Sequence, residues 1–195
     1  MVTNNFEQIR SLLNFKDDYF YFIQIIQRKK EHPELGKNNR VIRSYNISSM
    51  DKYDANIKEI ITMCETFNAR AYIHLNRRKW SQISLECLRH NAHLIANGQY
   101  DGIKSSLETI IGRICGEPKE TKTWIIDIDG QEFPSPIMMA NIDHKYRPLG
   151  VAKCIAVIPT KNGCHLITKP FDVQVFKELY PDVDIHKDNP TVLYA

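Results

Sequence analysis

The sequence predicts a single α+β domain with a mixed or antiparallel sheet flanked by helices. The chain of 195 residues is 43% hydrophobic and 25% charged, which is typical of one globular domain with a proper core. Segments with the alternating period of β-strands are interspersed with segments that have helical apolar spacing. An Asn-Gly pair in the loop 159–163 lies between two β-rich runs, and this pattern is typical of an antiparallel hairpin.

Apolar periodicity defines the expected elements of the N-terminal part. Residues 6–13 have apolar residues at helical spacing, and a longer helix with the same spacing is expected after Ser49, a good N-cap. The segments 19–26 and 40–47 are rich in aromatic and β-branched residues, so we expect a hairpin of two strands. Residues 70–76 alternate and predict a further strand.

The C-terminal part combines helices with a second hairpin. Residues 81–96 and 103–114 have helical spacing, whereas the run 123–129 is β-branched and predicts a strand that ends in Asp-Gly. The segments 155–158 and 164–168 are the two strands of the hairpin with the Asn-Gly turn. The remaining expected elements are a helix over 137–144, a short helix over 173–179 and a last strand over 191–194.

The charge distribution permits a nucleic-acid partner without requiring one. The formal net charge is +3, and residues 1–100 carry 15 Lys and Arg against 10 Asp and Glu, whereas residues 101–195 carry 11 against 13. A basic surface beside an acidic pocket suits an enzyme that holds a polyanion next to a bound metal ion. Two ordinary solvated faces would give the same totals.

Cysteine usage and hydropathy indicate the compartment. The five cysteines are widely spaced and form no CxxC pair, which favours reduced thiols in the cytoplasm. No signal segment opens the chain, and no apolar run approaches the roughly 20 residues that a membrane span requires. We therefore expect a soluble cytoplasmic protein without a membrane partner.

Asp127 and Asp129 are the first candidates for chemistry. Alternate residues of a strand point to the same face, so the two carboxylates are expected to project together. Two adjacent carboxylates repel unless a cation lies between them, and Mg²⁺ prefers oxygen ligands of this kind. An acidic, solvated strand end fits the same pattern, and a second Asp-x-Asp triplet occurs at Asp182 and Asp184 in a turn-rich stretch.

His165 and Asp188 are the second and third candidates. His165 follows the predicted hairpin turn, and the flanking Lys161 and Lys169 could help it to hold phosphate oxygens. A packed or surface histidine is the alternative interpretation. Asp188 precedes the last predicted strand and could add a carboxylate to the pair, although an Asn- and Pro-rich turn explains it equally.

The order of these motifs resembles the catalytic core of the archaeo-eukaryotic primase superfamily, whose primase–polymerases are common in phages and mobile elements. Asp127-x-Asp129 at the end of an apolar strand is similar to the first family motif, which binds divalent metals. His165 is similar to the second motif, a histidine that contacts the incoming triphosphate. Asp188 corresponds to the third motif, a further metal-binding Asp, and Asp184 competes for that role.

The resemblance covers about residues 70–195, with 1–69 as an integral helix–hairpin–helix part of one domain spanning 1–195. The family's usual Ser before the histidine is absent, because Lys161-Asn162-Gly163-Cys164 stand there instead, and we expect neither a zinc-binding stem nor a helicase or helical accessory domain. A stand-alone core, a subunit of a larger machine and a core that has lost activity all stay open.

The resemblance implies a metal-dependent nucleotidyltransferase that synthesises or extends a strand on a single-stranded template with nucleoside triphosphates, in DNA replication. Mg²⁺ or Mn²⁺ would be held by Asp127, Asp129 and Asp188, and a separate helicase or replication protein is a possible partner. The remaining expected roles are triphosphate binding by Lys161, His165 and Lys169, template binding by Arg77, Arg78 and Lys79, and base stacking by Trp80 or Tyr72. The alternatives are a non-catalytic module that binds single-stranded nucleic acid and a divalent-metal nuclease.

Overall fold

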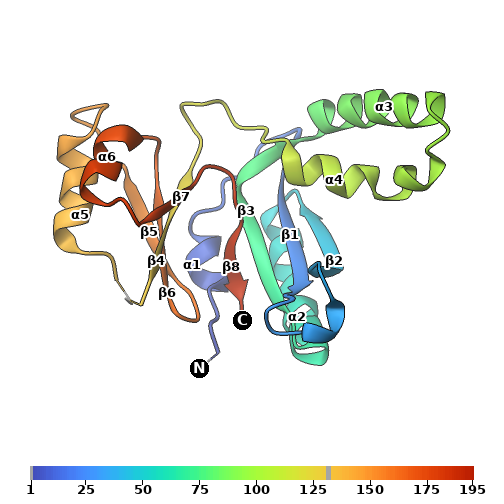
Figure 1. Ribbon diagram of the computed structural model, residues 1–195, viewed down its shortest axis with the longest axis horizontal. Helices are drawn as coiled ribbons and strands as arrows, with labels where there is room; N and C mark the ends of the chain where they lie inside the picture. Colours follow the sequence, from blue (N-terminus) through green and yellow to red (C-terminus); the bar gives the residue numbers. More distant parts are fainter. Residues whose placement is uncertain (1, 131–132) are drawn as a thin grey trace.

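Residues 2–130 and 133–195, which the computed structural model describes, form two antiparallel sheets of four strands each (Figure 1). Sheet A has the strand order β2-β1-β3-β8, and its strands are β1 (Tyr19–Gln27), β2 (Arg40–Ile47), β3 (Arg70–Lys79) and β8 (Thr191–Tyr194). Sheet B has the order β5-β6-β4-β7, and its strands are β4 (Trp124–Asp129), β5 (Cys154–Pro159), β6 (Gly163–Thr168) and β7 (Asp184–His186). The chain therefore builds three strands of sheet A, then all of sheet B, and returns to sheet A with β8.

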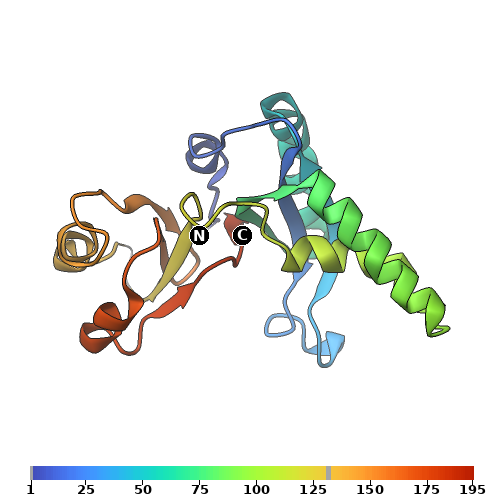
Figure 2. The same cartoon turned by 90° about the horizontal axis from the view of Figure 1, so that it is seen from above.

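Helices flank both sheets. In chain order they are α1 (Phe6–Arg10), α2 (Met50–Phe67), α3 (Trp80–Ala96), α4 (Ser106–Arg113), α5 (Pro136–Ala140) and α6 (Val173–Leu179). Short 3₁₀ turns occupy Pro33–Leu35 and Tyr100–Ser105, and a π-helical turn occupies Asn141–Lys145. In Figure 2, α3 and α4 extend away from sheet A at one end of the molecule, and α5 and α6 lie beyond sheet B at the other. In the part of the chain that the structure describes, no helix is long and apolar enough to cross a membrane.

The predicted α+β class is confirmed, and so is the hairpin of β5 and β6 beside β4. The structure differs from the expectation of one sheet, because its strands form two four-stranded sheets; the last predicted strand, β8, pairs with β3 in sheet A. Strand β7 was not predicted: it has three residues, of which Asp184 and His186 are polar, so its sequence carries no strand pattern. Strand β3 also runs to Lys79, three residues beyond the predicted end.

The alternation of β4 places its residues in two different environments. Ile126 and Ile128 belong to the core that sheet B shares with α5 and α6. Ile125, on the opposite face, belongs to the core that includes strands of sheet A. Because successive strand residues point to opposite faces, Asp127 and Asp129 lie on the same face as Ile125, towards sheet A.

A buried arginine joins sheet A to the segments that enter and leave sheet B. Arg78 on β3 is fully buried, and its guanidinium donates hydrogen bonds to the Ile111 carbonyl (2.7 Å), the Asn76 carbonyl (3.0 Å) and the Asp188 carboxylate (3.0 Å). Its Nη2 lies 2.9 Å from Nδ1 of His74. The Asn76 side chain also donates to the Asp188 carboxylate (3.1 Å), so the loop before β8 is held against β3.

The prediction that Arg77, Arg78 and Lys79 form an exposed basic corner at the cleft is wrong. Arg78 is inaccessible because it forms the buried network described above. Arg77 is paired with Glu117 and donates to the Asn14 carbonyl (2.8 Å), and its side chain is 16% exposed. Lys79 is half-buried, with its Nζ 5.9 Å from the centre of the Tyr19 ring, and none of the three residues is among those that line the cleft.

His74 makes this junction sensitive to acid. Burial, with a further contribution from Arg78, lowers the pKa of His74 from 6.5 to about 4, so the folded protein holds this ring neutral. Between these two pH values the unfolded chain binds a proton that the folded chain does not. The contribution of neutral His74 to the free energy of unfolding is therefore complete above pH 6.5. As the pH falls towards 4, the free energy of unfolding decreases by about 3 kcal/mol.

We expect His74→Gln to flatten this pH dependence of the free energy of unfolding, measured by urea denaturation between pH 7.5 and 4.5. The slope is the informative quantity, because the substitution also changes the absolute stability. His144→Gln is the control, since His144 is exposed. An unchanged slope in His74→Gln would contradict the assignment of a neutral, buried imidazole.

Candidate active site

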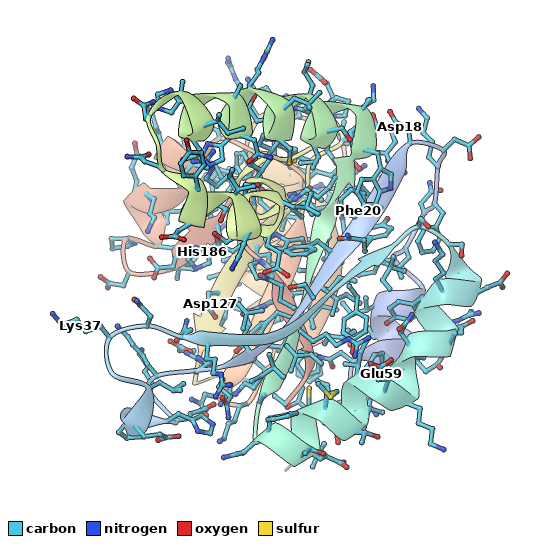
Figure 3. All side chains as sticks on the ribbon, turned by 90° about the vertical axis from the view of Figure 1, so that its right-hand side faces the viewer. Asp18, Phe20, Lys37, Glu59, Asp127 and His186 are labelled. Atoms are coloured by element: carbon cyan, nitrogen blue, oxygen red, sulfur yellow. The ribbon has the colours of Figure 1, made fainter. Side chains whose placement is uncertain are left out.

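A cleft of about 710 Å³ lies between the two sheets and collects several of the predicted site residues. One wall comes from sheet B and its loops, with Asp127, Asp129, Lys161 and His165. The opposite wall comes from sheet A and the β1–β2 connection. Figure 3 shows this side of the molecule and labels Asp127 and His186, which both line the cleft, and Lys37 on the connection between β1 and β2.

The two carboxylates of β4 share the cleft, as the strand alternation predicts. Asp127 is half-buried and Asp129 is exposed. The alternate residues Ile126 and Ile128 face α5 and α6, and their burial locks the register that directs both carboxylates the other way. The expectation of a common face is therefore confirmed.

His165 lies directly opposite Asp127 in the β4–β6 register. Its Nε2 is 3.6 Å from Oδ1 of Asp127, and its Nδ1 is 2.8 Å from the hydroxyl of Thr191, the first residue of β8. Burial lowers the pKa of His165, while Asp127 acts in the opposite direction. Since a carboxylate accepts hydrogen bonds, the fitting tautomer carries its proton on Nε2 and accepts from Thr191 at Nδ1.

Gly163 permits the close approach of β6 to β4. It pairs with Asp129, and a Cβ atom added to it would lie 2.0 Å from the Ile128 carbonyl oxygen. The clashing atoms belong to the main chain of β4, so no change of side-chain rotamer could relieve the collision. Gly163 therefore sets the distance at which His165 faces Asp127 across the two strands.

Besides Arg77, Arg78 and Lys79, two further predicted site residues are not brought to the cleft. The carboxylate of Asp188 is bound by Arg78 and Asn76, and Asp188 is not among the cleft-lining residues, so it does not join Asp127 and Asp129. Lys169 follows the far end of β6 from Lys161 and likewise lies outside the cleft lining.

Asp184, the competitor for the third carboxylate, is better placed. It lies opposite Asp127 in the β4–β7 register, and directly opposite residues project from the same face of a sheet. Its side chain is exposed, and it stands just outside the residues that line the cleft. Within residues 2–130 and 133–195, no three His, Cys, Asp or Glu side chains are close enough together to hold a metal ion.

Sequence reasoning missed the basic wall of the cleft. Arg28 and Lys30, which follow β1, and Arg70 at the start of β3 all line it. Arg70 is paired with Glu31, with its Nε 3.0 Å from that carboxylate. The run Arg28-Lys29-Lys30 was a visible signal, but its relation to β4 depends on how the two sheets meet.

Of the two aromatic residues expected to stack on bases, Tyr72 lines the cleft. Trp80 does not, because its ring is stacked on Phe20 with the ring centroids 4.0 Å apart. His186 on β7 also lines the cleft and was missed together with its strand.

Comparison with protein-family models, curated proteins and solved structures finds no match for this chain.

Thr191 is expected to fix the tautomer of His165. Thr191→Val keeps the shape of the side chain but removes the hydroxyl, so the ring nitrogen loses its buried partner at a cost of about 1 kcal/mol. Nitrogen-15 NMR of the imidazole should show one tautomer in the wild type and a mixture in Thr191→Val. Thr191→Ser restores the hydroxyl and should restore the single tautomer. Identical spectra for all three proteins would refute this role.

Gly163→Ala should separate β6 from β4. The added methyl group collides with the backbone at Ile128, so we expect a loss of about 2 kcal/mol or more in the free energy of unfolding. Gly112→Ala is the matched control, because nothing lies within 4 Å of a Cβ there and alanine favours the helix. Equal stability of the two variants in urea denaturation would show that the strands adjust without cost.

Proposed function

We propose that this protein is a metal-dependent nucleotidyltransferase of the primase–polymerase type. The observation that carries the proposal is the combination in one cleft of the carboxylates Asp127 and Asp129 with His165, facing a wall that contains Arg28 and Arg70. A cleft with one acidic and one basic wall suits a polyanion that reacts beside a divalent cation.

The donor set of β4 fits a hard divalent cation. Asp127 and Asp129 present oxygen atoms from one face of one strand, and Asp184 is the carboxylate best placed to join them instead of Asp188. Mg²⁺ or Mn²⁺ bound there would supply Lewis-acid activation of a phosphoryl group.

The other cleft residues would bind and orient the nucleic acid and the nucleotide. His165, with Nε2–H towards the cleft, and Lys161 on the β5–β6 turn would donate hydrogen bonds to triphosphate oxygens. Arg28 and Lys30 would contact the phosphates of a single strand, and Tyr72 would offer a ring to one of its bases.

One observation favours a second candidate, a module that binds single-stranded nucleic acid without catalysis. The described residues lack a cluster of three metal-ligating side chains, whereas the basic wall and Tyr72 would suffice for binding. A nuclease would use the same carboxylates and is separated from a polymerase by its products.

The test is an assay of de novo priming and primer extension on single-stranded DNA with nucleoside triphosphates and Mn²⁺ or Mg²⁺. The proposal expects products longer than the primer that disappear in Asp127→Asn and Asp129→Asn. Shortened DNA would identify a nuclease, and metal-independent binding without any product would identify the non-catalytic module.

A divalent cation should also stabilise the folded protein by linkage. At a free Mn²⁺ concentration about 100-fold above Kd, the stabilisation is about 2.7 kcal/mol, which thermal melting would register as a rise in Tm. Asp127→Asn and Asp129→Asn should abolish this rise. Without metal, each variant should be at least as stable as the wild type, because one of two repelling charges is gone.

Asp182→Asn is the control for these melts, since it belongs to the other Asp-x-Asp triplet and is exposed. It should retain the response to Mn²⁺. A structural role for the β4 carboxylates gives the reverse pattern: the Asn variants lose stability without metal, and Mn²⁺ has no effect on the wild type.

A further inference from the structure

A second concavity, of about 900 Å³, lies on the opposite face of sheet B from the active-site cleft. Trp124 contributes to it, and this residue alternates with Ile125 and therefore points away from the cleft. The volume falls within the roughly 300–1,000 Å³ typical of ligand sites. The floor and mouth are largely apolar, with side chains from Trp124, Pro148, Leu149, Pro170, Phe171 and Val173.

The rim of this pocket is cationic. Lys119, Arg147 and Lys187 are exposed on three different segments, and each lines the pocket. Among the residues that the structure describes, no carboxylate forms an ion pair with any of the three. The nearby Asp172 is engaged as the N-cap of α6, where it accepts from the amide of Gln174 (3.1 Å).

An apolar floor beside three exposed cations and the single carboxylate of Asp172 favours a ligand that is both apolar and anionic. We propose that this pocket binds an acidic peptide segment of a partner protein, which inserts one bulky apolar side chain between Phe171 and Leu149, beside Trp124, and directs carboxylates to Lys119, Arg147 and Lys187. Leu149, a residue that is 61% exposed at the mouth of the pocket, would be covered by the inserted side chain.

The aromatic geometry disfavours a nucleic-acid strand in the same place. A base needs an open ring face, but Nζ of Lys187 lies 5.1 Å from the centre of the Trp124 ring, and the Phe171 ring lies 5.7 Å away at an angle of 57°. An aliphatic or aromatic side chain that inserts into the concavity does not need an open ring face on which to stack. The site is also separate from the active-site cleft, so the inference does not rest on the proposed function.

The probe is an array of short peptides rich in Asp and Glu, each with one variable position. That position is Phe, Leu or Trp in the test peptides and Ser in the reference peptide. The proposal expects the peptides with a bulky apolar residue to bind, the Ser peptides to bind at least about tenfold more weakly, and the NMR signal of the Trp124 indole to shift on binding. Peptides in which every Asp is replaced by Asn and every Glu by Gln should lose binding, because the cations of the rim would then have no carboxylate partners.

Variants of the protein locate the binding. Lys119→Glu with Arg147→Glu should weaken it about tenfold or more, a change of about 1.4 kcal/mol, and Leu149→Asn should do so at unchanged charge on the rim. All three residues are exposed, so the fold should tolerate these changes. Lys58→Glu with Lys104→Glu is the control of equal charge, on exposed positions of α2 and the Tyr100–Ser105 turn.

Three results would overturn the proposal. The first is equal affinity for the apolar and the Ser peptides, and the second is wild-type affinity in the variant that carries Lys119→Glu and Arg147→Glu. A single-stranded oligothymidylate that shifts the Trp124 indole, when no peptide does so, would assign the pocket to nucleic acid instead.

Discussion

The burial of Arg78 is the constraint on which the arrangement of the two sheets depends. A guanidinium removed from water costs several kcal/mol unless its charge and its donors are satisfied. The Asp188 carboxylate and the Ile111 carbonyl satisfy it, and they come from the loop before β8 and from α4. The chain that leaves sheet B must therefore return to β3. A second link between the sheets comes from Asn5, which lies along the other edge of β8 and donates to the carbonyl of Pro159 on β5 (2.9 Å).

The cleft is a consequence of this junction. Because β8 belongs to sheet A but starts beside β6, its first residue Thr191 can reach His165 in the other sheet. The same geometry sets the acidic face of β4 against the basic start of β3 and the end of β1. Asp129 is exposed and Asp127 is half-buried in this space, so both carboxylates can keep contact with solvent, which lowers the cost of placing them on one strand face.

Local features of the fold could be predicted from the sequence, and long-range ones could not. The Asn162-Gly163 turn defines the hairpin of β5 and β6, and the apolar run before Asp127 predicts the strand β4, whose pairing with β6 brings His165 to Asp127. Arg78 was misjudged because arginines are rarely buried and the sequence does not show its distant partner Asp188. The position of Arg28 in the cleft and the pairing of β8 with β3 could not be predicted for the same reason, because contacts between the two sheets determine both.

The most direct measurement of the central claim is anomalous scattering from crystals of the protein grown with Mn²⁺ and a non-hydrolysable nucleoside triphosphate. We predict a manganese peak between the carboxylates of Asp127 and Asp129, with the triphosphate beside His165 and Lys161. A cleft without manganese, or manganese bound solely at another acidic site such as Asp182, would contradict the account.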